Sequence, residues 1–301
     1  MVSDAKSEPS GLPPALGAYI IWGFLPLYLI LVATVPPFEF VAWRIVWTLP
    51  ICLGIVLLRG QWPDLRAALA DRRALLVLTA SAVLIAINWF VYVWAVQSGH
   101  IYSASLGYYI NPLVNVLLGT VILGERLSRL QWLAVAIAAI GVAVLAAGAL
   151  TTLWISLTLA CSFGTYGLLR KQVAVGSLPG LTIESAILLL PSAAIAAWYA
   201  ASPAGSSFTE SLGLSLSIVL GGFLTAIPLL LFAVAARRMD YSTLGITQFI
   251  APSIVFLLGL TVFDKPLLPA QAICFALIWV ALAIFVWDLL AKRRGARPVA
   301  T

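Results

Sequence analysis

Charged residues are scarce in this sequence. Asp, Glu, Lys and Arg make up 9% of its 301 residues, whereas soluble domains carry roughly 25%. Hydrophobic residues make up 62% and the mean hydropathy is +1.07, so a water-soluble fold would have no interior large enough to bury them. A bilayer supplies an apolar solvent, and a helix crosses it with about 20 apolar residues. The composition therefore excludes a soluble domain of useful size and predicts an all-α integral membrane protein.

Residues that serve catalysis or metal binding are also few. The chain has one histidine, His100, and three cysteines, Cys52, Cys161 and Cys274, which all lie within apolar runs. The sequence contains no cluster with metal-ligand spacing and no nucleophile–base pair. The glycines lack the spacing of a nucleotide-binding loop. We therefore expect no catalytic residues, no metal and no cofactor, and an integral membrane enzyme is the least favoured function.

Apolar runs and the breakers between them predict ten membrane-spanning helices. The clearest boundaries are Pro36-Pro37, the polar run 59–73 and the loop at 203–207. The predicted spans cover residues 16–35, 38–58, 74–96, 103–123, 130–149, 152–169, 179–200, 212–236, 241–262 and 270–290. Short tails, 1–15 and 291–301, remain at the two ends.

The basic residues indicate how the chain is oriented. With ten spans both termini lie on one side, and all of the 17 basic residues except Arg44 and Lys265 fall on that side. The positive-inside rule therefore predicts that both termini are cytoplasmic. Because these residues are scattered over short segments, we expect no nucleic-acid partner.

Parts of the chain repeat at a near-constant offset. The identities that share it are Pro112 with Pro252, Gly119 with Gly259, and Gln131 with Gln271. Their order predicts a duplication of five helices, with copies at 16–149 and 152–290. Because five is an odd number, the second copy starts on the opposite side of the membrane and the copies are inverted. Inverted repeats are typical of alternating-access transporters, whose binding site lies near the midplane.

Several longer motifs resemble the RarD group of EamA-domain transporters. They are Asn88-Trp89 and the runs 104–113 (ASLGYYINPL), 123–126 (LGER), 131–135 (QWLAV), 242–245 (STLG) and 275–286 (FALIWVALAIFV). The resemblance covers nearly the whole chain, from about residue 17 to 288. It implies membership of the drug/metabolite transporter superfamily, two inverted EamA repeats, a bacterial inner-membrane location and a role in efflux.

Two charged residues within predicted spans are candidates for function. Arg44 lies about six residues into its span, or about 9 Å from the outer end, and either faces a cavity as a cation for an anionic substrate or extends to the interface. Glu184 occupies the matching position in the second copy, near the inner face, so about 12 Å would separate it from Arg44 along the membrane normal. A direct ion pair between the two is not expected. Glu184 either binds a coupling proton or is a structural acid, and the structural interpretation is favoured.

The best cavity candidates lie beside the repeated prolines. Pro112 and Pro252 cannot donate to the carbonyls four residues earlier, which would free acceptors at Tyr108 and Gln248. Asn111 and Asn115 share a helix face. We expect these groups to line a central cavity, although ordinary hydrogen bonding between helices is the alternative. Asn88, Trp89 and Trp22 complete the candidate substrate-binding set.

The sequence therefore favours a secondary transporter that moves small metabolites or drugs by alternating access. Export is the direction that the resemblance implies. A facilitator or channel for small solutes is the alternative. The expected partners are a small-molecule substrate and membrane lipid, and a monomer is compatible with the sequence. Substrate identity, coupling ion and oligomeric state are left open.

Overall fold

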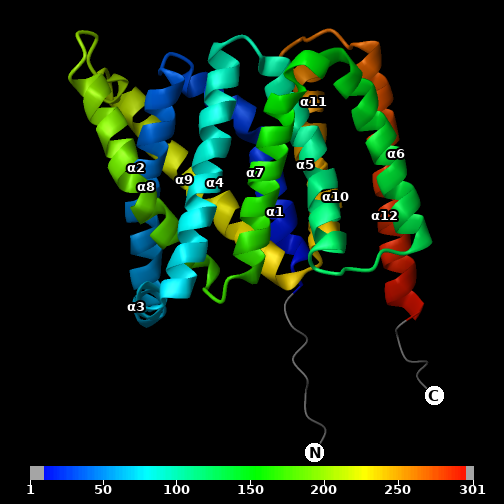
Figure 1. The fold of residues 1–301 in the computed structure, drawn as a ribbon. Helices are drawn as coiled ribbons and strands as arrows, with labels where there is room; N and C mark the ends of the chain where they lie inside the picture. The colour runs from blue at the N-terminus through cyan, green and yellow to red at the C-terminus, as the bar shows by residue number, and fades with distance from the viewer. Residues whose placement is uncertain (1–9, 296–301) are drawn as a thin grey trace, which may run out of the picture.

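The computed structural model describes residues 10–295, and within them the chain forms α-helices and short 3₁₀ turns without any β-strand. Figure 1 shows the long helices standing side by side as one bundle. Residues 1–9 and 296–301 of the predicted tails lie outside the described residues. The all-α prediction is confirmed for the part of the chain that the structure describes.

The helices follow one another along the chain with short connections. They are α1 (Leu12–Leu29, extended by the 3₁₀ turn Ile30–Val32), α2 (Pro37–Leu58), α3 (Trp62–Ala70), α4 (Arg72–Gln97), α5 (Ile101–Val121), α6 (Arg129–Ala146, followed by the 3₁₀ turn Ala147–Thr152), α7 (Leu153–Gln172), α8 (Ser177–Ala200), the 3₁₀ turn Ser207–Thr209, α9 (Leu212–Arg238), α10 (Tyr241–Thr247), α11 (Ile250–Thr261) and α12 (Pro269–Gly295).

Nine helical segments among the described residues are long and apolar enough to cross a membrane. Each matches a predicted span, with ends that differ by a few residues. The remaining predicted span is α5, which has 21 residues and packs between α7 and α10. Its serine, asparagine and tyrosine residues make it more polar than the other nine, so the count of ten rests on its length and its place in the bundle (Figure 1).

The outer surface of the bundle is apolar. Leu58 and Leu190 are 89% and 80% exposed, and many other large apolar side chains are also uncovered. Such a surface would aggregate in water, whereas acyl chains solvate it. The chain is therefore a multi-pass membrane protein.

Polar side chains define where several helices begin. Asp71 accepts hydrogen bonds from the backbone of Arg73 and Ala74 at 2.9 and 3.1 Å, which caps α4. Ser128 and Gln131 form a reciprocal capping box at the start of α6. These caps satisfy amide groups that have no partner within the helix. The helix starts are thus fixed by local sequence.

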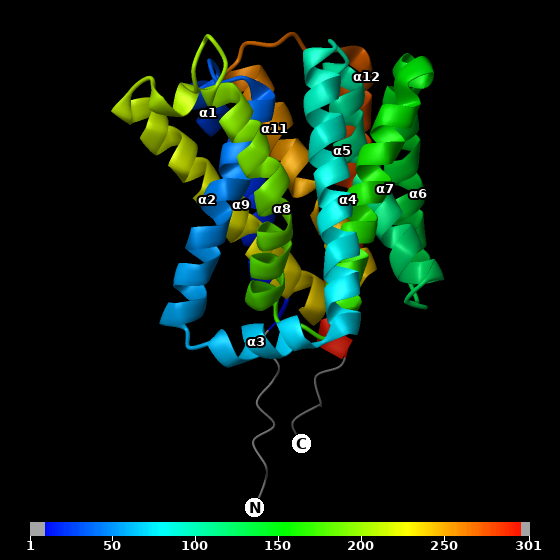
Figure 2. The ribbon, with the colours of Figure 1, turned by 60° about the vertical axis from the view of Figure 1, so that its left-hand side comes forward.

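Helix α3 is a feature that the sequence analysis missed. The run 59–73 was expected to be a polar connection, but it contains this nine-residue helix. Leu65 and Ala68 are buried against the bundle while Asp64 and Arg66 are exposed. Figure 2 shows α3 lying across one end of the bundle. Its amphipathic pattern suits an interface rather than a span.

The two prolines of the repeat act differently. Helix α5 continues through Pro112, but the chain is broken at Gln248 and Phe249, between α10 and α11. The prediction that Pro252 frees the carbonyl of Gln248 is wrong, because this carbonyl accepts a hydrogen bond from the backbone of Ala251 at 3.1 Å. A tight turn satisfies the oxygen that a continuous helix would have left unpaired.

Corresponding helices begin at a regular spacing. The offset that relates Pro112 to Pro252 also separates the starts of α2 and α8, α4 and α9, α5 and α10, and α6 and α12, and the starts of α1 and α7 deviate from it by a single position. Packing follows the same pattern, since α4 packs against α7 as α9 packs against α1. Helix α1 begins and α12 ends at one end of the bundle (Figure 1), which we call the terminal end. The loops α5–α6, α7–α8 and α9–α10 lie at this end, and the other end is the opposite end.

Candidate functional site

Arg44 lies on α2, and one of its three guanidinium nitrogens is hydrogen-bonded to another helix. Its Nε donates a hydrogen bond to Thr225 Oγ1 on α9 at 2.8 Å. Its Cζ lies 5.4 Å from the ring centroid of Phe40 and 5.6 Å from that of Trp89. Among the described residues, neither Nη atom has a hydrogen-bond partner and no carboxylate forms an ion pair with Arg44. The side chain is partly exposed, so it presents two free donors beside an aromatic face.

Two glycines on α9 make room for residues of α2. A Cβ at Gly221 would come within 2.6 Å of the Tyr28 hydroxyl and 3.1 Å of Arg44 Cγ. A Cβ at Gly222 would come within 2.7 Å of Trp47 Cβ. Because these positions carry no side chain, α2 and α9 approach closely. The stem of Arg44 therefore lies against the backbone of α9 instead of extending into lipid.

Three tyrosines, Tyr28, Tyr92 and Tyr108, lie within the range of the charge of Arg44. The rings of Tyr92 and Tyr108 meet edge to face, with centroids 5.8 Å apart, and Tyr108 is 44% exposed. The structure thus brings together three residues that sequence analysis singled out, Arg44, Trp89 and Tyr108.

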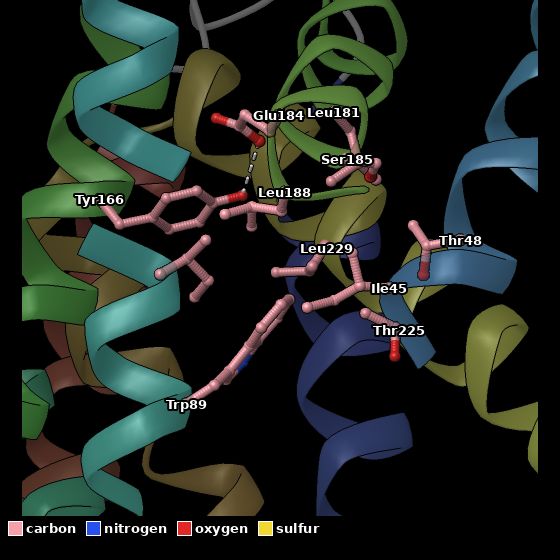
Figure 3. Close-up of a pocket in the computed structure, with 11 residues that line it drawn as sticks. Ile45, Thr48, Trp89, Tyr166, Leu181, Glu184, Ser185, Leu188, Thr225 and Leu229 are labelled. Carbon is pink, nitrogen blue, oxygen red and sulfur yellow. Dashed lines mark hydrogen bonds between the residues drawn. The ribbon is translucent and has the colours of Figure 1, made fainter. Parts of the chain in front are cut away.

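A narrow cavity runs between five helices (Figure 3). Its volume is about 10 Å³, close to the space that one water molecule needs. Trp89 and Thr225 line it and also contact Arg44. The full lining, from α2, α4, α7, α8 and α9, is Ile45, Thr48, Ile85, Trp89, Tyr166, Leu181, Glu184, Ser185, Leu188, Thr225 and Leu229. The cavity is mainly apolar and has a carboxylate in its wall.

That carboxylate belongs to Glu184, which makes a buried ion pair. Arg170 Nε lies 3.6 Å from Glu184 Oε1, and the two side chains are 0% and 3% exposed. Ser81 donates to the same oxygen. The Tyr166 hydroxyl donates to Oε2 at 3.4 Å, as Figure 3 shows. Glu184 is therefore bonded to α4 and α7 while it also borders the cavity.

Arg170 was missed as a site residue by sequence analysis, which counted it with Lys171 as a loop cation. Its Nη2 donates to the Ser177 carbonyl at 2.9 Å. Its Nε and Nη1 have no hydrogen-bond partner among the described groups. A methyl group at Gly180 would collide with the guanidinium, so Gly180 provides the space. The only sequence signal was an arginine and an acid on either side of a short turn that contains glycine.

The predicted amides lie away from this cavity. Asn88 donates to the Leu159 carbonyl at 2.8 Å and Asn111 donates to the Ala160 carbonyl at 2.7 Å. Asn115 donates to Gln248 Oε1 at 2.8 Å. All of these side chains are buried. They join α4, α5, α7 and α10 to one another, as in the helix-to-helix alternative.

Trp22 lies behind the cavity in an aromatic cluster. Its ring centroid is 5.7 Å from that of Phe163 and 5.8 Å from that of Phe232. Phe163 in turn lies 5.8 Å from Tyr166, which lines the cavity. Trp22 therefore packs behind the residues that line the cavity and does not line it itself. Within the described residues no group of three or more His, Cys, Asp or Glu side chains could hold a metal ion.

Comparison with known proteins identifies the family. Residues 9–147 match the model of the EamA-like transporter family. The chain is 42% identical to Protein RarD of Salmonella typhimurium over 299 residues, which cover 97% of this chain and 99% of the relative. It is 44% identical to an uncharacterised transporter of Pseudomonas aeruginosa, over 91% of this chain and 92% of the relative.

Two further similarities are to a curated relative and to a solved structure. A relative from Pseudomonas aeruginosa called Chloramphenicol-sensitive protein RarD is 33% identical over 95% of this chain and 98% of its own length. A solved crystal structure of a protein superposes with a TM-score of 0.72 at 22% identity, over 94% of this chain and 98% of that one. The latter similarity concerns the fold alone.

Proposed function

The chain belongs to the RarD-type EamA transporters, and we propose that it is a secondary transporter that moves small metabolites or drugs across the bacterial inner membrane. Its relatives are named as transporters, and the membrane fold agrees with that role. We further propose alternating access between two inverted five-helix repeats. The regular spacing of helix starts and the paired packing of α4 with α7 and α9 with α1 support this mechanism.

The orientation is part of the proposal. We place the terminal end in the cytoplasm because the loops at that end carry the basic residues that the positive-inside rule associates with it. Arg59, Arg72 and Arg126 are examples, and all three are exposed. Export would then carry solutes from the terminal end to the opposite end.

Arg44 is the observation that carries the proposal for the substrate site. An uncompensated cation within a membrane bundle is costly, yet the two Nη atoms of Arg44 have no partner among the described residues. A planar guanidinium with two parallel donors fits a carboxylate or phosphate group. Trp89 offers an adjacent aromatic face and the cavity walls are apolar. We therefore propose small amphipathic anions or zwitterions as the substrate class.

Glu184 is proposed as the coupling site for a proton. Burial disfavours its ionised form, whereas the charge of Arg170 favours it. The charged and titratable groups around the pair are Cys52 on α2, Tyr166 on α7 and Arg237 on α9, which faces Arg170. Because Glu184 borders the same cavity as Trp89 and Thr225, a substrate bound at Arg44 that widens this cavity and a proton on Glu184 would influence each other.

Transport into proteoliposomes tests the function. The panel would contain anionic, zwitterionic and neutral metabolites and drugs, including chloramphenicol because one relative is named for sensitivity to it. Each compound would be measured with and without a pH gradient. A secondary transporter is expected to show counterflow, in which excess unlabelled compound inside drives uptake of labelled compound. Flux without counterflow would indicate a facilitator or channel, and no flux of any compound would contradict the proposal.

A further inference from the structure

The two proposed repeats are joined at the terminal end by the carboxylate of Glu125. This residue lies in the loop between α5 and α6, in the first repeat. Its Oε1 accepts a hydrogen bond from the backbone of Tyr241 at 2.6 Å. Its Oε2 accepts from the backbone and the hydroxyl of Ser242, at 2.8 and 2.7 Å. One carboxylate of the first repeat thus receives three donors from the start of α10 in the second.

Glu125 occupies the place of a missing local cap. Asp240 precedes α10, but its side chain makes no capping hydrogen bond. Hydrogen bonds to an ionised carboxylate are shorter and stronger than neutral ones. The amides at the start of α10 therefore depend on a residue from the other repeat. Separating the repeats at this end would leave those amides without their present partners.

The contact needs close approach. A Cβ at Gly119 would come within 2.5 Å of Ser242 Oγ and 2.6 Å of Glu125 Oε2. Nearby, Lys171 Nζ donates to the carbonyls of Ala236 and Met239 at 2.9 and 2.7 Å. The Tyr241 hydroxyl donates to the Gly164 carbonyl at 2.6 Å. The α9–α10 turn is therefore held by polar contacts from the α5–α6 loop and from α7.

The corresponding place at the opposite end is open. Lys265 is the counterpart of Glu125 at the offset that relates the two repeats, and α5 is likewise the counterpart of α10. Lys265, Ile101 and Tyr102 line a cavity of about 400 Å³ between α5, α6, α11 and the start of α12. Among the described residues the Lys265 side chain makes no hydrogen bond or ion pair. A lysine cannot accept hydrogen bonds from amides, so it cannot form the contact that Glu125 forms.

We infer that Glu125 is a latch that keeps the terminal end closed. Its three hydrogen bonds must break before the narrow cavity lined by Trp89 and Glu184 opens to that side. This inference rests on the proposed alternating access. It explains why the same structural position is sealed at one end and open at the other. The latch shares no residue with the proposed substrate site at Arg44, and it needs no substrate to act.

Cysteine labelling tests the latch without a substrate. Ser185, a buried side chain of the cavity wall, is replaced by cysteine in a chain whose Cys52, Cys161 and Cys274 are replaced by serine or alanine. A membrane-impermeant thiol reagent is applied to vesicles of either orientation. We expect the parent to react faster from the opposite end. Glu125→Gln is expected to raise the rate from the terminal end by about tenfold, the effect of losing about 1.4 kcal/mol.

Two further variants keep the test decisive. Ser242→Ala removes one of the three donors to Glu125 and is expected to give a smaller increase in the labelling rate. This second variant keeps the test valid if Glu125→Gln does not fold. Glu210→Gln changes an exposed acid near the opposite end and is expected to react like the parent. If Glu125→Gln and Ser242→Ala both react like Glu210→Gln, the latch is refuted. If the parent reacts equally from both ends, the terminal end is not closed and the latch is refuted, whereas alternating access is tested separately by the counterflow measurement.

Discussion

Replacing Arg44 by alanine tests the proposed substrate site most directly. The variant removes the guanidinium whose Nε is bonded to Thr225 and whose Nη atoms are free among the described residues. Trp89 and the apolar cavity walls remain in place. An anionic substrate should therefore lose its charged contact and keep its apolar contacts.

The size of the loss follows from the geometry. A hydrogen bond to a charged group contributes about 1.5–3 kcal/mol, which corresponds to about 10- to 150-fold in affinity. Because Arg44 is partly exposed, solvent screening favours the lower part of this range. A neutral compound with the same skeleton should lose much less. Arg44→Lys should restore only part of the affinity, because an ammonium group cannot reproduce the planar fork.

The assay compares two compounds on matched variants. Concentration dependence of uptake into proteoliposomes gives the apparent affinity for an anionic compound found in the panel and for its neutral amide. Arg59→Ala is the control, since it removes an exposed arginine at the other end of α2. If Arg44→Ala matches Arg59→Ala for both compounds, Arg44 is an anchor between α2 and α9 and the substrate site lies elsewhere.

Three other predictions concern the ion pair and the topology. Arg170→Gln leaves Glu184 as an unpaired buried charge, so the free energy of unfolding in detergent should fall by about 3–5 kcal/mol. The double variant Arg170→Gln/Glu184→Gln should recover part of this loss, and equal stability of the single and double variants would contradict the pairing. In transport, the double variant should retain counterflow but lose accumulation driven by a pH gradient, whereas unchanged accumulation would exclude Glu184 as the proton site. Reporter fusions at Thr301 and in the loop Ser202–Thr209 should lie on opposite sides of the membrane, and detection on the same side would contradict the proposed topology.

The spans could be predicted from sequence because lipid leaves a chain few alternatives. An apolar run of sufficient length must form a helix to satisfy its backbone, and prolines or polar clusters mark its ends. Helix α5 shows the limit of composition alone, since its polar residues weaken its signal as a span. Helix α3 was missed because nine residues with two buried apolar positions resemble an ordinary loop.

The environment of the site could be predicted only in part. Arg44 was singled out because a charge at that depth needs a reason, and Trp89 because it is an aromatic residue in the middle of a span and not near its ends. The contacts of Glu184 could not be predicted, since Arg170 ends one helix and Gly180 gives it space in the next. The amides illustrate the converse. Asn111 and Asn115 share a helix face, but that face meets α7 and α10 instead of the cavity.

The charges of the two proposed repeats are reversed at matching positions. The repeat offset that relates Arg44 to Glu184 also relates Glu125 to Lys265. In each pair the acid is bonded, Glu184 to Arg170 and Glu125 to the start of α10, while the base is free of ion pairs among the described residues. Identical charges at these two pairs of positions would favour neither end of a pseudo-two-fold transporter. With these reversed charges, an anion that enters from the opposite end meets a free cation, whereas one that enters from the terminal end meets a latch and a neutralised pair. If the proposed alternating access holds, the residues that differ between the repeats would therefore set the preferred resting state, while the helices that the repeats share would carry out the movement.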